Sequence, residues 1–270
     1  MGKGIWNDYH VHSSISPDAG TDMEKMCEEA LNKGMKEIIF TDHYEFYSRG
    51  KKSPYFHKAY LDEYFIQLER CREIFCGKLL IKAGMEFGQS HLAAQRAECI
   101  ARTYPFDYLI GSVHKLDNID LEEMKYTRDC VGLIAEKYYE NLLELACTGT
   151  FDCIGHFDLC KRHFTKHGFL EEPQKQEAMI RLILKEIILR GKGIEINTSG
   201  LRQSPKETMP GAFILKMYRD LGGYIITVGS DAHKPEDIGA GFDSAYSLLK
   251  EAGFHEIAVF SKRKYRMETI

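Results

Sequence analysis

The sequence predicts an α/β protein folded as a distorted TIM-like barrel. Three observations support this fold: apolar strand-like runs alternate with amphipathic helical segments, glycines follow several of the helical segments, and polar residues that suit metal binding follow the strand runs. Strands that alternate with helices are connected in parallel, so their carboxyl ends meet at one rim. An open doubly wound sheet is the main alternative.

Eight apolar runs have the length and composition of β-strands. Most are rich in Ile, Val, Leu, Phe or Tyr, and turn residues separate them from the segments that follow. They cover residues 5–10, 37–41, 79–86, 106–113, 151–155, 193–197, 224–229 and 255–260. Eight strands are enough to close a barrel.

Seven segments between these runs show helical periodicity. They cover residues 22–33, 60–76, 91–103, 131–148, 173–190, 211–221 and 242–252. Thr21 and Glu24 have the spacing of a capping box, which predicts the start of the first helix. Gly34 can adopt the left-handed conformation that ends this helix, and Gly77, Gly149 and Gly191 are placed to end later ones.

The composition is that of a globular protein with one large core. The chain has 270 residues, of which 44% are hydrophobic and 28% are charged, and neither a Pro/Ser-rich linker nor an internal repeat divides it. We therefore expect a single domain over residues 1–270. The mean hydropathy of −0.34 and the lack of a long apolar run argue against a membrane-spanning helix. The N-terminus lacks the apolar stretch of a signal peptide, so we expect a cytoplasmic protein.

The charge of the chain argues against nucleic acid as its partner. A formal net charge of −4 provides no general positive field, and the only notable basic cluster, residues 262–266, is short enough to be a solvated tail. The eight cysteines form no CxxC pair and are expected to be reduced. A small molecule is therefore the expected partner, while the oligomeric state is not indicated.

Candidate metal ligands lie at the carboxyl ends of six of the strand runs. They occur in the motifs DYHVH (Asp8, His10, His12), TDH (Asp42, His43), GMEFG (Glu86), GSVH (His114), GHFD (His156) and GSDAH (Asp231, His233). Side chains two residues apart on a strand share a face, and a buried polar group without a partner costs a few kcal/mol. Imidazole and carboxylate ligands suit Zn, Mn, Fe or Co. The pattern predicts a metal site that draws ligands from several strand ends.

Taken in order, these motifs resemble the PHP (polymerase and histidinol phosphatase) superfamily, and most closely its stand-alone histidinol-phosphate phosphatases. The resemblance extends from Asp8 to the last predicted helix. It implies a PHP-type (β/α)7 barrel with two to three divalent ions at the carboxyl rim. The implied ligand sets are His10, His12, Glu86 and Asp231 for one ion; Glu86, His114 and His156 for a second; and Asp18, His43 and His233 for a third. Asp8 and Asp42 are expected to orient these ligands.

The resemblance also implies the reaction. L-histidinol phosphate would be hydrolysed to L-histidinol and phosphate in histidine biosynthesis, by a hydroxide that bridges two ions, with Glu86, Asp231 and His233 as catalytic residues. Three divalent ions and three ligand carboxylates leave a charge of roughly +3, which a phosphate dianion and a hydroxide neutralise. The sequence contains neither a GxSxG elbow nor a phosphate-binding P-loop.

Candidate substrate contacts are Arg162, Arg202, Ser112 and Asn197, all close to strand ends. The loops 44–59 and 115–129 follow ligand-bearing strands and are expected to shape the pocket. Two alternatives stay open. A PHP phosphoesterase could act on another small phosphate, phosphotyrosine or a nucleic-acid end, and a non-catalytic binding module could use metal for stability alone.

Overall fold

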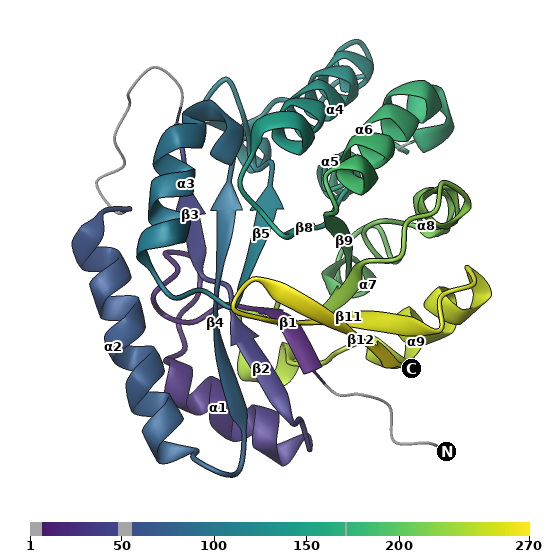
Figure 1. The fold of residues 1–270 in the computed structure, drawn as a ribbon. Helices are drawn as coiled ribbons and strands as arrows, with labels where there is room; N and C mark the ends of the chain where they lie inside the picture. Colours follow the sequence, from purple (N-terminus) through teal and green to yellow (C-terminus); the bar gives the residue numbers. More distant parts are fainter. Residues whose placement is uncertain (1–6, 48–55, 171) are drawn as a thin grey trace.

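A parallel β-sheet of eight strands forms the centre of the structure, a computed structural model that describes residues 7–47, 56–170 and 172–270 (Figure 1). The main path runs in the order β1 (Asn7–Val11), β2 (Glu37–Phe40), β4 (Leu80–Gly88), β5 (Tyr108–Ser112), β8 (Cys153–Ile154), β9 (Gly193–Asn197) and β10 (Ile226–Gly229). The short strand β3 (His43–Glu45) pairs with the end of β4. Ile5 and Trp6 of the first predicted strand, and residues 48–55 of the first predicted loop, lie outside the described residues.

The two ends of the sheet meet, so the sheet closes into a barrel. Val11 and Ala232 form a parallel bridge, and the His12 amide donates to the Ala232 carbonyl at 2.9 Å. This closure places β10 beside β1 and excludes the open doubly wound sheet. The predicted distorted TIM-like (β/α)7 barrel is confirmed.

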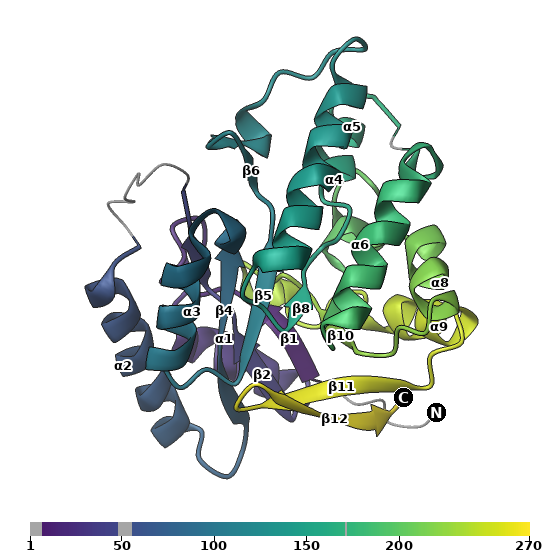
Figure 2. The same ribbon diagram turned by 45° about the horizontal axis from the view of Figure 1, so that its top comes forward.

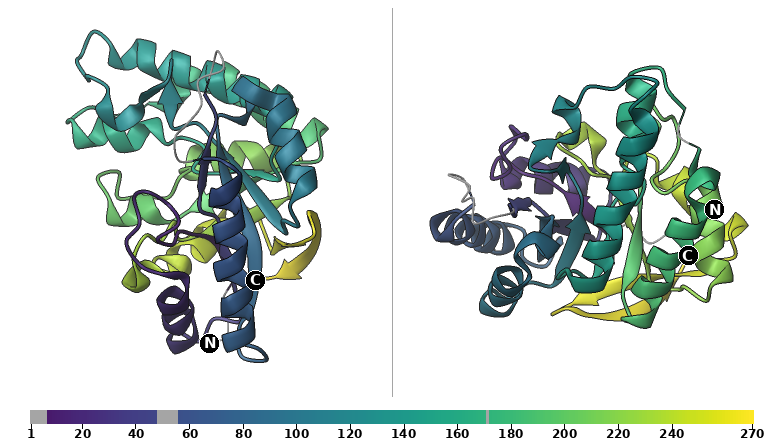
Figure 3. Two further views of the ribbon diagram at one scale, coloured as in Figure 1. Left: turned by 90° about the vertical axis from the view of Figure 1, so that its left-hand side faces the viewer. Right: turned by 90° about the horizontal axis from the view of Figure 1, so that it is seen from above.

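All seven predicted helices are present, and they lie around the outside of the sheet (Figure 3). They are α1 (Met23–Asn32), α2 (Lys58–Ile74), α3 (Ala94–Thr103), α4 (Val131–Thr148), α6 (Glu177–Leu189), α8 (Ala212–Asp220) and α9 (Phe242–Glu251). The predicted capping box was one residue off, because Asp22 rather than Thr21 caps α1 and accepts from the Lys25 amide. Among the described residues, none of the helices is long and apolar enough to cross a membrane.

The eighth predicted strand is real but does not belong to the barrel. It is β11 (Glu256–Ser261), which pairs antiparallel with β12 (Lys264–Thr269) in a hairpin beneath the barrel (Figure 2). The hairpin turn is held by two aspartates that directly precede barrel strands: the Lys262 amide donates to Asp107 at 2.9 Å, and Arg263 pairs with Asp152. The basic cluster at 262–266 therefore lies at the amino ends of the strands.

Aromatic side chains fill the barrel at the hairpin end. The ring of Tyr108 lies 5.2 Å from that of Tyr9 and 4.9 Å from that of Phe260, and all three side chains are buried. Packing of this kind closes the lower end of a barrel. The functional pocket is consequently at the other rim, where the strands end.

Candidate metal centre

Glu86, at the end of β4, lies in the middle of the histidines that the sequence motifs identify. Its Oε1 is 3.1 Å from His114 Nε2 and 2.8 Å from His156 Nε2, and its Oε2 is 3.3 Å from His10 Nε2 and 2.9 Å from His43 Nδ1. These histidines come from four different strand ends. The barrel thus gathers residues that are up to 146 positions apart around one carboxylate.

Asp231, which follows β10, contributes a second carboxylate to the cluster. Its Oδ1 is 3.3 Å from His12 Nε2, 3.6 Å from His10 Nε2 and 3.5 Å from His233 Nδ1. Asp231 has a φ of 55° and His156 a φ of 25°, conformations that side-chain-bearing residues rarely adopt. Backbone strain of this kind is typical of functional sites.

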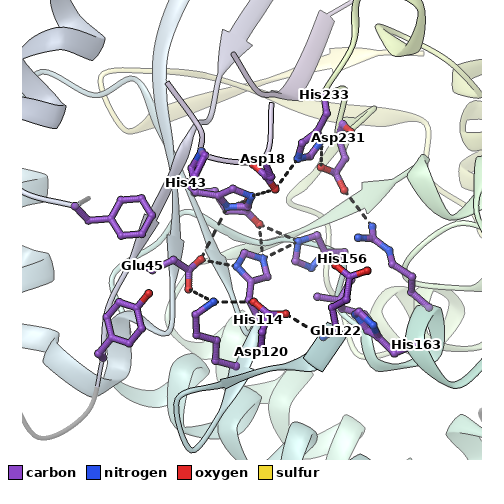
Figure 4. Close-up of a pocket in the computed structure, with 17 residues that line it drawn as sticks. Asp18, His43, Glu45, His114, Asp120, Glu122, His156, His163, Asp231 and His233 are labelled. Atoms are coloured by element: carbon purple, nitrogen blue, oxygen red, sulfur yellow. Dashed lines mark hydrogen bonds and ion pairs between the residues drawn. The ribbon is translucent and has the colours of Figure 1, made fainter. Parts of the chain in front are cut away.

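Asp18 joins the cluster from the loop after β1. Its Oδ2 lies 3.2 Å from His43 Nε2 and 3.2 Å from His233 Nε2 (Figure 4). The side chain of Asp18 is 52% exposed, whereas that of Glu86 is 1% exposed. All nine residues predicted as metal ligands are therefore brought together, and Asp18 stands on the solvent side.

The donor atoms are arranged as metal ligands would be. Glu86 Oε2 is buried and faces three ring nitrogens, yet it makes no hydrogen bond to any described residue. Four groups of three residues have possible ligand atoms within 4.8 Å of one another: His10/His12/Asp231, His10/Glu86/His156, His43/Glu86/His114 and His12/His43/His233. Shared imidazole and carboxylate donors of this kind fit divalent transition metals.

The carboxylates create a strongly negative field in the metal-free cluster. Burial opposes protonation of His10, but Glu195 and two further carboxylates outweigh it and hold the pKa of His10 well above its usual value. Burial likewise opposes protonation of His114, while Glu86 and Glu45 raise its pKa to about 9. The metal-free cluster thus holds protons on His10 and His114, because the negative field of the carboxylates favours positive charge at these rings.

The pKa of His12, in contrast, lies below its usual value. Burial, together with the neighbouring His233 and His43, lowers its pKa to about 3. His12 is consequently a neutral imidazole, the form that binds metal.

Asp42 and Asp8 lie behind the cluster, as expected. Asp42 Oδ1 accepts from Ser16 Oγ at 2.7 Å, and this hydroxyl is 3.1 Å from His12 Nδ1. Asp8 accepts from the amides of Ser230 and Gly239, both at 2.9 Å, and so fixes the segment that carries Asp231. Both aspartates orient ligand-bearing residues rather than facing the pocket.

A pocket of about 400 Å³ opens above the cluster, a size suited to a small ligand. Its floor includes Glu86, His114 and Asp231. Its walls include Arg162 and residues of the two loops predicted to shape it, among them Glu45, Asp120 and Glu122, which confirms that prediction for their described residues (Figure 4). The walls also include His163, which the sequence motifs did not indicate. His163 belongs to none of the motifs, but Leu159, Cys160, His163 and Phe164 have helical spacing on one buried face of the α5 (Cys160–Lys166) region, a signal that could have located it.

Of the two arginines predicted to contact substrate, Arg162 lines the pocket and Arg202 does not. Arg162 lines the pocket, and among the described residues its Nε has no hydrogen-bond partner. Arg202 instead donates to the Ser230 carbonyl at 2.8 Å and pairs with Asp237 at 3.1 Å. The structure therefore gives Arg202 a role in holding the segment before Asp231, and its contact with substrate stays a prediction.

Ser112 and Asn197 lie below the pocket surface. Ser112 Oγ donates to Glu86 Oε1 at 2.6 Å. Asn197 Nδ2 donates to Glu195 Oε2 at 3.1 Å, and its Oδ1 accepts from Ser199 Oγ at 2.6 Å. Both are buried and neither is among the residues that line the pocket, so their binding of substrate also stays a prediction.

Comparison with known proteins identifies the family. The model of the PHP domain family matches residues 8–199. A histidinol-phosphatase of Lactococcus lactis subsp. lactis is 32% identical over 265 residues, which cover 95% of each protein. A probable histidinol-phosphatase of Thermotoga maritima is 29% identical, with 95% of this chain and 96% of the relative covered.

A solved structure shares the whole fold. The crystal structure of histidinol phosphate phosphatase from Lactococcus lactis, complexed with zinc, L-histidinol and phosphate, is similar with a TM-score of 0.84 and 27% sequence identity. The match covers 97% of this chain and 99% of that chain. The chain described here therefore belongs to the PHP domain family.

Proposed function

We propose that this protein is a metal-dependent phosphatase that hydrolyses L-histidinol phosphate to L-histidinol and phosphate, as a single PHP-type domain in the cytoplasm. The observation that carries the proposal is the position of Glu86, whose two carboxylate oxygens face the ring nitrogens of four strand-end histidines at the floor of the pocket. The curated names of the relatives and the zinc, L-histidinol and phosphate in the similar structure agree with it.

Nine residues would hold two to three divalent ions. The proposed sets are His10, His12, Glu86 and Asp231; Glu86, His114 and His156; and Asp18, His43 and His233. Zinc is present in the similar structure, and Mn, Fe or Co would also suit these ligands. When bound, such ions acidify water to a nucleophile and offset the charge of the phosphoryl oxygens.

The residues of the chain itself account for binding and orientation of the phosphate. Arg162 Nη2 donates to Ser199 Oγ at 2.8 Å and pairs with Asp231 Oδ2 at 3.2 Å, which fixes the guanidinium plane at the edge of the cluster. The guanidinium of Arg162 lines the pocket, and the side chain is 23% exposed, so it can donate to a phosphoryl oxygen. Asp231, held by Arg162 through one oxygen, keeps its other oxygen toward the histidines.

Other residues of the pocket wall suit a cationic, aromatic leaving group. Asp120 and Glu122 supply carboxylates, and Tyr47 and Phe56 supply aromatic rings. Burial lowers the pKa of His163 to about 4, so this imidazole is neutral and can accept a hydrogen bond. An ammonium group and an imidazole ring, both present in L-histidinol, match such a surface. The basic hairpin turn, in contrast, lies at the opposite end of the barrel, where it cannot guide nucleic acid to the pocket.

Rates on three substrates test the assignment. We expect the metal-loaded protein to hydrolyse L-histidinol phosphate with a kcat/KM about 10²-fold or more above that for phenyl phosphate, because contacts to a charged leaving group are worth a few kcal/mol. Single-stranded DNA should not be cleaved. A kcat/KM for L-histidinol phosphate no higher than that for phenyl phosphate would refute the substrate and favour another phosphoesterase of this family.

Binding of divalent ions is expected to release protons. The pKa values of His10, His43 and His114 are raised in the metal-free cluster, so these rings carry protons at about pH 7, whereas a metal-bound imidazole nitrogen carries none. The apparent affinity should therefore rise with pH as these three rings lose their protons. Calorimetric titration with Zn²⁺ in two buffers of different ionisation enthalpy measures the protons released. Zero release near pH 7 would contradict this description of the cluster.

A further inference from the structure

Two buried glutamates beside the cluster, Glu195 and Glu45, are not among the nine proposed ligands. We propose that they are positioning residues, each of which holds the ring of one ligand histidine so that its opposite nitrogen faces the metal ions. The inference rests on the proposed function, since it requires that the cluster binds metal. It assigns to these two residues a role that neither the sequence motifs nor the pocket lining indicates.

Glu195, on β9, holds His10. Its Oε1 is 2.7 Å from His10 Nδ1, while His10 Nε2 points to Glu86 Oε2 at 3.3 Å. A ring nitrogen that donates to a carboxylate carries the hydrogen, so the opposite nitrogen keeps the lone pair that a metal needs. The other oxygen of Glu195 accepts from the His156 amide at 3.0 Å and from Asn197 Nδ2 at 3.1 Å. These contacts hold the Glu195 carboxylate in place, and the carboxylate in turn holds the His10 ring.

Glu45, on β3, holds His114 in the same way. Its Oε1 is 2.7 Å from His114 Nδ1, while His114 Nε2 points to Glu86 Oε1 at 3.1 Å. Gln89 secures both partners, because its Nε2 donates to Glu45 Oε2 at 2.7 Å and its Oε1 accepts from the His114 amide at 2.6 Å. Glu195 therefore orients the ring that faces Oε2 of Glu86, and Glu45 orients the ring that faces Oε1.

Glycines on the neighbouring strands make room for both carboxylates. A Cβ atom at Gly229 would lie 2.2 Å from Glu195 Oε1, and one at Gly88 would lie 2.2 Å from Glu45 Oε1. Neither glycine has a positive φ, so backbone conformation does not require glycine at these positions. Glycine is required there to leave space for the carboxylate, because any side chain at Gly229 or Gly88 would displace it.

The partners of Glu195 distinguish a residue that positions a ligand histidine from a carboxylate in an ordinary buried ion pair. Within the described residues, the ion pair of Glu195 is with His10 alone. Glu37, a buried glutamate on β2 at the hairpin end, instead pairs with Lys82 at 2.7 Å and accepts from Tyr9 at 2.7 Å. Glu37 is thus a matched control: a buried barrel carboxylate that touches no proposed ligand.

The test compares Glu195→Gln, Glu45→Gln and Glu37→Gln with the unsubstituted protein. Each metal-free protein is titrated with Zn²⁺ against a chromophoric chelator, and its thermal unfolding is recorded without metal. We expect Glu195→Gln and Glu45→Gln each to weaken zinc binding about 10- to 100-fold, the usual effect of removing a group that orients a ligand. Glu37→Gln should retain the original zinc affinity even if its Tm falls.

A second pair of readouts covers variants that fold poorly. The absorption bands of the Co²⁺-loaded protein should shift in Glu45→Gln, because the His114 ring changes orientation, and should stay unchanged in Glu37→Gln. Gly88→Ala leaves every carboxylate and ligand in the chain but displaces Glu45, so it should reproduce the loss of zinc affinity. Unchanged zinc affinity in Glu45→Gln and in Gly88→Ala would overturn the inference while leaving the proposed function intact. Absence of zinc binding by the unsubstituted protein would instead overturn the proposed function.

Discussion

Replacing Glu86 with glutamine is expected to lower kcat/KM for L-histidinol phosphate by about a thousandfold or more. A bound metal contributes several kcal/mol to the transition state, and about 4 kcal/mol corresponds to a factor of about 10³. Glutamine has the size of glutamate, but it lacks the negative charge and turns an NH2 group toward one of the two pairs of histidines. The substitution therefore affects both ligand sets that share this carboxylate.

Steady-state kinetics and metal analysis together measure this effect. Zinc content per chain should fall along with activity, and Glu37→Gln, prepared in parallel, should keep both. Thermal unfolding of the metal-free variant shows whether it folds. A Glu86→Gln protein with full zinc content and more than about a tenth of the original kcat/KM would contradict a central role for Glu86.

Replacing Arg162 with methionine is expected to lower kcat/KM by about 10²- to 10³-fold, the usual effect of removing one preorganised donor from a charged transition state. Methionine fills similar space without charge or hydrogen-bond donors. Arg162→Lys should recover part of this loss, because lysine restores the charge but not the planar arrangement of donors. The loss should be equal for L-histidinol phosphate and phenyl phosphate, since Arg162 is proposed to contact the phosphate that they share.

Two controls isolate the phosphate contact of Arg162. Zinc content must be measured, because Arg162 also pairs with Asp231, at 3.2 Å. Arg219→Met removes an arginine that stacks on Phe254, 5.4 Å from the ring centroid and outside the pocket lining, and should leave kcat/KM unchanged. An Arg162→Met protein that retains zinc and stays within threefold of the original kcat/KM would refute the proposed contact.

The barrel and most of the cluster could be predicted from local patterns, whereas Asp18, which lies in a loop, was indicated only by the resemblance to the PHP superfamily. Apolar runs that end in His, Asp or Glu mark strand ends, and a closed parallel barrel brings all strand ends to one rim. Glu86 and His114 are 28 positions apart, yet they lie on neighbouring strands and end 3.1 Å apart. No knowledge of loop conformation was needed for this part.

The hairpin and the supporting glutamates depend on tertiary contacts that one sequence does not reveal. β12 is mostly exposed, so its sequence has the polarity of a tail, and β11 has the apolar pattern of a barrel strand although it packs beneath the barrel. The sequence indicates Asn197 as a candidate substrate contact, and Glu195 lies two positions before it on the same strand. The structure turns Glu195 to His10, since the closed barrel places β1 within reach of β9.

Titration of the metal-free protein with zinc, with turnover of L-histidinol phosphate followed at each step, shows whether the cluster of histidines and carboxylates works as a metal-dependent phosphatase. We expect negligible turnover without metal, a rise that saturates at two to three ions per chain, and full reversal when a chelator is added. Turnover of L-histidinol phosphate by metal-free protein at the rate of the loaded protein would contradict this expectation.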